Sequence, residues 1–198
     1  MRFPRTVATV TAVLALTLTA CGPGGEASDG KAFNDADADF AGDMIQHHAQ
    51  ALEMVDLTLG RDLSPETATL AEGIRAAQAP EIEKMADWLE DWGRPVPATS
   101  RDHANAHAEE HGGSAGAEMD ADMPGMMSAE DMSALESAPD AEFENLWLEM
   151  MVDHHEGAVA MAQTEIDEGR HPKAVALAED IVSTQQEEIS TMEDLLSR

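Results

Sequence analysis

The chain has 198 residues, with 11 Lys and Arg against 40 Asp and Glu, which gives a formal net charge of −29 at pH 7. This length allows one compact domain with additional segments and excludes a large multidomain enzyme. The charge repels phosphate backbones and anionic headgroups, so nucleic-acid binding is not expected. One Cys excludes a disulfide framework and a Cys-based zinc site. With 43% hydrophobic but only 4% aromatic residues, the composition favours an all-α protein with an aliphatic and Met-rich core.

Residues 1–20 have the layout of an export signal. Two Arg residues precede an apolar stretch at residues 7–18 that is too short to span a bilayer. The run Leu-Thr-Ala-Cys that ends at Cys21 resembles the bacterial lipoprotein signal, in which the Cys becomes the lipid-modified first residue on the extracytoplasmic side of the membrane. An ordinary cleavable signal is the alternative. Residues 21–35 would then form a flexible tether.

An internal duplication organises the rest of the chain. Residues 40–89 align without a gap to residues 147–196, and 16 of the 50 pairs are identical. In both copies apolar residues recur at spacings of three and four, and the pattern is interrupted by a Gly and then by a Pro, which occupies the same place in the two copies. This pattern predicts helices at residues 36–60, 65–92, 140–168 and 172–197.

The short connections within each copy predict two antiparallel hairpins, at residues 36–92 and 140–197. Each hairpin has an apolar stripe to bury, so we expect the two to pack as one four-helix bundle over residues 36–197. Residues 93–138 form an insert between the hairpins. Within this insert, a short helix is expected to begin after Ser128 and to end at Pro139.

Four His side chains fall near the middle of their predicted helices, as two His-His pairs at equivalent positions of the repeat. Gln78 and its equivalent Gln185 interrupt the apolar stripes of the other two helices at a similar level. Burying such groups without partners costs about 1–3 kcal/mol each. The pattern therefore predicts a polar layer at the waist of the bundle, held either by a His–Gln hydrogen-bond network or by a bound ligand.

The surroundings of the His pairs favour copper as that ligand. In both copies a Met lies three residues before the first His and another lies seven residues after it. Thioether and imidazole together suit copper, especially Cu(I), whereas zinc on the four His is the alternative metal. Met at this spacing also fills helical cores. The Glu-x-x-His pattern of di-iron oxidases is absent at both His-His pairs, so no enzymatic activity is expected. The candidate ligands are His47, His48, His154, His155, Met44, Met54, Met151 and Met161.

The insert has a metal-binding pattern of its own. Residues 103–132 contain three His at a spacing of four and five Met, interleaved with acidic residues and Gly. Short His-rich tracts often bind metal, and exposed Met would have no core to fill. An acidic, solvated linker is the alternative. The candidate ligands here are His103, His107, His111, Met123, Met126 and Met127.

The sequences MIQHHAQALEM at residues 44–54, MVDHHEGAVAM at 151–161 and MPGMMS at 123–128 resemble the signature of domain-of-unknown-function family 305. The resemblance covers about residues 36–197. It implies a ferritin-like four-helix bundle and exported proteins linked to copper binding and copper resistance, and it brings no enzymatic activity. We therefore expect an exported, lipid-anchored protein that buffers or delivers copper, with a non-metal structural or interaction module of the cell envelope as the alternative.

Overall fold

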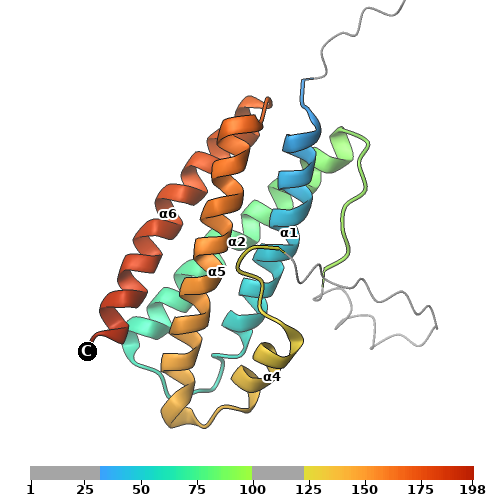
Figure 1. The fold of residues 1–198 in the computed structure, drawn as a ribbon. Coiled ribbons are helices and arrows are strands. Elements are labelled where there is room, and N and C mark those ends of the chain that lie inside the picture. The colour runs from blue at the N-terminus through green and yellow to red at the C-terminus, as the bar shows by residue number, and fades with distance from the viewer. Residues whose placement is uncertain (1–31, 100–122) are drawn as a thin grey trace, which may run out of the picture. The chain divides into compact units, whose positions relative to one another are not determined.

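The computed structural model describes residues 32–99 and 123–198 (Figure 1). The predicted signal, Cys21, most of the tether and residues 100–122 lie outside this part of the chain. No helix in the described part is long and apolar enough to cross a membrane. The helices in this part are α1 (Asp35–Asp56), α2 (Pro65–Asp91), α4 (Ala129–Ser137), α5 (Asp140–Glu168) and α6 (Pro172–Leu196).

The predicted helices are confirmed, with one correction at the end of α1. We expected this helix to reach residue 60, but it ends at Asp56, because residues 57–60 form tighter turns and Gly60 has a positive φ of 81°. Leaving the helix early lets Arg61 bond the carbonyls of Glu136 and Ala138 at 2.7 and 2.9 Å, which joins this turn to the end of α4. The short helix expected after Ser128 is α4, and Ser128 caps it.

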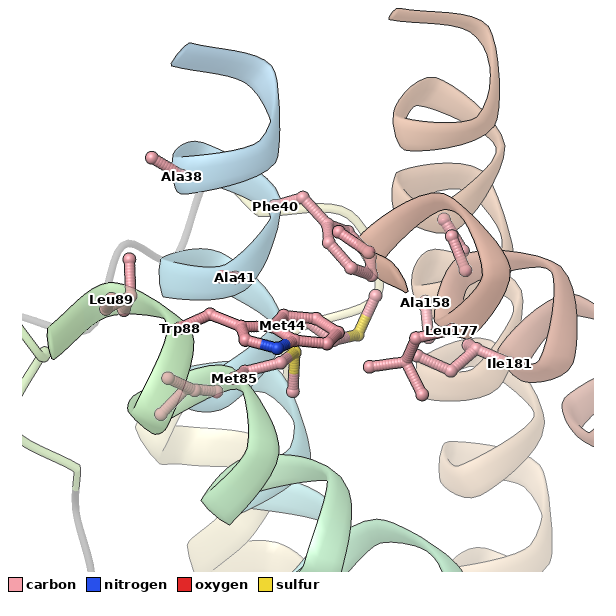
Figure 2. Packing of buried hydrophobic residues seen from close by; sticks show 14 residues of the cluster. Ala38, Phe40, Ala41, Met44, Met85, Trp88, Leu89, Ala158, Leu177 and Ile181 are labelled. Atoms are coloured by element: carbon pink, nitrogen blue, oxygen red, sulfur yellow. The ribbon is translucent and has the colours of Figure 1, made fainter. Parts of the chain in front are cut away.

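The core has two parts, one at each end of the bundle. Figure 2 shows Met44, Met85 and Trp88 gathered within the first of them. We call the first core cluster Ala38, Phe40, Ala41, Met44, Ile45, Met85, Trp88, Leu89, Ala158, Ala162, Ala174, Leu177, Ala178 and Ile181. We call the second core cluster Ala51, Met54, Val55, Ala71, Ile74, Leu135, Phe143, Trp147, Leu148, Met150, Met151 and Met192.

The two hairpins are antiparallel and related by the repeat. Met44 lies in the first core cluster whereas its equivalent Met151 lies in the second, and Met85 and Met192 divide in the same way. In Figure 1, accordingly, α1 starts at the end of the bundle where α5 finishes. Most contacts between helices lie within the α1–α2 and α5–α6 hairpins and between α1 and α5. The predicted all-α, ferritin-like four-helix bundle is confirmed.

Two buried carboxyl groups join the start of α1 to the end of α5. Asp37 is fully buried and accepts hydrogen bonds from the backbone N–H groups of Arg170 and His171, at 2.9 and 2.7 Å. Burial raises the pKa of Asp37, but its backbone hydrogen bonds, first that from Asn34, outweigh this effect and leave the pKa below its ordinary value. Burial raises the pKa of Glu165 to about 8, and the neighbouring carboxylate of Asp37 adds to the shift. Glu165 is therefore protonated at neutral pH.

Replacing Glu165 by Gln is expected to remove a loss of stability at alkaline pH. In the wild type the folded state releases this proton near pH 8 and the unfolded state near 4.5, so the free energy of unfolding falls as the pH rises between these values. From about pH 6.5 to about pH 8.5 we expect a fall on the order of 2 kcal/mol, and none in the variant. Urea denaturation at both pH values measures this. The exposed Glu149→Gln variant on the same helix should behave like the wild type.

Candidate metal centre

The four His of the two doubled motifs form one buried layer across the bundle. All four are fully buried. The rings of His47 and His154, on neighbouring helices, have centroids 3.8 Å apart, and those of His154 and His155 are 6.4 Å apart. On α1 the His pair lies between Met44 of the first core cluster and Met54 of the second. The predicted polar layer at the waist is confirmed.

One His in each repeat is held by a carboxylate on the next helix. The Nε2 atom of His48 lies 2.8 Å from Oε2 of Glu81, and that of His155 lies 2.9 Å from Oε2 of Glu188. Of the two alternatives for the layer, a His–Gln network is not formed by Gln78, because both amide atoms of this buried side chain lack a hydrogen-bond partner. Glu81 lies three residues after Gln78, at the edge of the apolar stripe of its helix. The identity of the two Glu in the repeat was the signal that could have identified the contact.

His47 and His154 have fewer partners. The Nε2 atom of His47 donates to the backbone carbonyl of Pro124 at 3.1 Å, since a carbonyl oxygen can only accept. Neither ring nitrogen of His154 has a partner. Burial, followed by electrostatic repulsion from the neighbouring His48, lowers the pKa of His47 to about 3. Burial, followed by electrostatic repulsion from the neighbouring His47, lowers the pKa of His154 well below its ordinary value. Both rings are therefore neutral at neutral pH and have free lone pairs.

The MPGMMS segment, residues 123–128, packs against α1 and α5 beside the His layer (Figure 1). The buried Gln50 binds the backbone of Met127 twice: its Nε2 donates to the carbonyl at 2.9 Å, and its Oε1 accepts from the N–H at 2.7 Å. Gly125 has a positive φ of 75° and lies so close to α5 that an added Cβ would be 2.9 Å from the His154 carbonyl. On α5, Gly157 makes room for the segment, since a Cβ there would be 2.6 Å from the Gly125 Cα.

The structure divides the four Met predicted as waist ligands between the two sides of the His layer. Met44 belongs to the first core cluster, and Met161 is partly buried against it. Met54 and Met151 belong to the second core cluster. These four Met therefore lie on opposite sides of the His layer and do not form one group.

The insert is more ordered near its end than its composition suggests. The expectation of exposed Met is wrong for the four that the structure describes, because all four are half-buried, and Met127 and Met132 pack against the second core cluster. Met127 and Met132 therefore contribute to the apolar core of the bundle. The other predicted ligands of the insert, His103, His107 and His111, lie outside the described residues.

The donor set of the layer fits a soft or borderline cation. Five buried ring nitrogens lack a hydrogen-bond partner: Nδ1 of all four His, and Nε2 of His154. In a neutral ring one of the two nitrogens carries no proton and is a Lewis base, and an unpaired buried polar group is otherwise costly. In residues 32–99 and 123–198 no group of three or more His, Cys, Asp or Glu is already arranged around a metal position.

The family profile described as "Domain of unknown function (DUF305)" matches residues 37–196. The chain belongs to the DUF305 family. A search of the curated proteins finds no match. A DUF305 fragment from Deinococcus radiodurans has a solved structure with 32% identity and a TM-score of 0.67, covering 83% of this chain and 97% of that one. A DUF305 protein from Streptomyces coelicolor, described as secreted, has 31% identity and a TM-score of 0.67, with coverages of 82% and 92%.

This DUF305 chain is also similar to a protein solved with metals. CopM in its Cu(I)-bound form has 27% identity and a TM-score of 0.62, and the match covers 81% of this chain and 95% of CopM. CopM has further been solved in Cu(II)-bound, Ag-bound and apo forms. The fold of this DUF305 chain is thus one that binds copper and silver in a relative.

Proposed function

We propose that this DUF305 protein is an exported, lipid-anchored copper-binding protein that buffers or delivers the metal and so contributes to copper tolerance. Its role is binding, without a catalytic step. The observation that carries the proposal is the buried His layer with five unpartnered ring nitrogens, bounded on both sides by Met. The Cu-bound forms of CopM and the secreted relative support the metal and the export.

The chemistry of the layer favours copper over harder cations. Imidazole nitrogen and thioether sulfur suit Cu(I), whereas Mg²⁺ and Ca²⁺ prefer oxygen ligands. His47 and His154 are neutral at physiological pH, so no proton has to leave before their nitrogens can bind a metal. The formal charge of −29 draws cations towards the protein. Zinc on the ring nitrogens is the alternative metal.

The proposal predicts that replacing His47 and His154 by Leu abolishes tight copper binding. Leu fills a similar volume and has no polar side-chain atom to bury, so we expect the variant to fold. Competition with chelators should show Cu(I) affinity lowered by more than about 100-fold, because losing two ligands exceeds the 10- to 100-fold effect of disturbing outer partners. Zinc and Cu(II) titrations identify the preferred metal. His171→Leu, outside the layer, is the matched control, and equal affinity of the double variant and this control would contradict the waist site.

A structural or interaction role without metal is the second candidate. The two His–Glu contacts favour it, since each joins the helices of one hairpin and satisfies one ring nitrogen. Under this alternative the layer fixes the register of the bundle. Thermal unfolding separates the candidates, because a metal that binds only the folded state must raise the melting temperature. A melting temperature unaffected by copper and zinc would favour the structural role.

A further inference from the structure

We propose that Glu81 and Glu188 are positioning residues of the His layer, each fixing the tautomer of one His so that its Nδ1 atom is the metal ligand. The inference rests on the proposed function and specifies the ligand atoms of the same site. The two carboxylates are not candidate metal ligands themselves and act only on the His rings that they contact. The partners are His48 for the first carboxylate and His155 for the second.

The direction of each hydrogen bond determines the tautomer. An ionised carboxylate can only accept, so His48 and His155 must each carry a proton on Nε2, where they contact the Glu at 2.8 and 2.9 Å. In a neutral ring this leaves Nδ1 without a proton. The Nδ1 atoms of both His are buried and have no hydrogen-bond partner. Each ring therefore keeps one lone pair free for a metal.

Burial makes these contacts effective. Both His side chains are 0% exposed, and the side chains of Glu81 and Glu188 are only 18% and 14% exposed, so water competes little for the ring N–H. A ligating His commonly donates its second ring N–H to a carboxylate or carbonyl, which orients the ring and raises the basicity of the ligating nitrogen. His48 and His155 both show the His–carboxylate half of this arrangement.

The same His–Glu hydrogen bond occurs in both copies of the repeat. Residues 48 and 81 align with residues 155 and 188, and the two contacts have nearly the same length. His47 obtains the same tautomer from the carbonyl of Pro124 instead of a carboxylate. Three of the four rings are thus fixed with Nδ1 free, and the ring without a partner on either nitrogen is His154.

The test compares two double variants of the full protein. Glu81→Ala/Glu188→Ala removes both acceptors, and Glu83→Ala/Glu187→Ala removes two exposed charges from the same helices. Copper affinity should fall about 10- to 100-fold in the first variant relative to the second. Glu81→Gln/Glu188→Gln should restore part of the affinity, because the Gln oxygen still accepts the ring N–H. Imidazole ¹⁵N spectra of the metal-free wild type should show protonated Nε2 and unprotonated Nδ1 at His48 and His155.

The outcomes separate this inference from the proposed function. Equal copper affinity of the two Ala variants, with tight binding by the wild type, would overturn the positioning role and leave the copper site standing. Mixed tautomers at His48 and His155 in the wild type would overturn it even if the Ala variants fail to fold. No tight copper binding by the wild type contradicts the proposed function itself, and the positioning role with it, whatever the spectra show.

Discussion

Acidification is expected to destabilise the metal-free protein through its two unprotonated His side chains, by about 3 kcal/mol between pH 6.5 and pH 5. His47 keeps a folded-state pKa of about 3 and that of His154 is also well below 6.5, whereas both take up a proton near 6.5 when the chain unfolds. For a base with a lowered folded pKa, stability is fully present above the unfolded pKa and is lost as the pH falls. Each His contributes roughly half of the expected loss.

The acid-induced loss of stability must be measured in a variant that lacks the Glu165 carboxyl group. Glu165 titrates in the opposite sense, because its raised folded pKa makes the protein more stable as the pH falls from about 8 towards 4.5. Urea denaturation should therefore be measured in Glu165→Gln, at pH 6.5 and pH 5. Adding the His47→Leu/His154→Leu changes to this background should abolish the loss. A loss of the same size after these changes would show that other groups cause the acid sensitivity.

The bundle could be predicted from the sequence because its signals are local and duplicated. Repeated apolar spacing, interrupted by a Gly and then a Pro, defines each hairpin. His47 and His154 are central in their helices, so they lie at one level of the bundle whichever way the hairpins cross. Both rings are buried, as their place beside the apolar stripe of each helix predicts. The end of α1 was missed because Arg61 binds carbonyls 75 and 77 residues further along the chain, which no local pattern encodes.

The contacts of the MPGMMS segment could not be predicted for the same reason. Gln50 and Met127 are 77 residues apart, and the segment is held through backbone atoms, which every residue carries. One signal was present in the alignment of the repeats. Gln50 is equivalent to Gly157, and the two positions differ where the segment passes: one side chain binds it and the missing side chain makes room for it. This difference between the two copies marks the position at which the MPGMMS segment breaks the symmetry of the bundle.

Gly157→Ala is expected to displace the MPGMMS segment and to lower the free energy of unfolding by about 3 kcal/mol, through the loss of buried hydrogen bonds and packing. The new Cβ would lie 2.5 Å from the Pro124 carbonyl carbon and 2.6 Å from the Gly125 Cα. Both are backbone atoms, so no side-chain rotation relieves the overlap. The bonds from His47 to Pro124 and from Gln50 to Met127 should break together, and hydrogen exchange at the Met127 amide should accelerate.

The sign of this effect distinguishes it from helix propensity. Ala is favoured over Gly in a helix by about 1 kcal/mol, so without the segment the substitution would stabilise α5. Gly73→Ala on α2 provides the control, since a Cβ there meets no heavy atom within 4 Å and should raise stability. Opposite signs for the two substitutions would show that the segment is bound at Gly157 in solution. If Gly157→Ala stabilised the protein as Gly73→Ala does, the segment would not be seated there, and His47 would lose its carbonyl partner and with it the fixed Nε2–H tautomer.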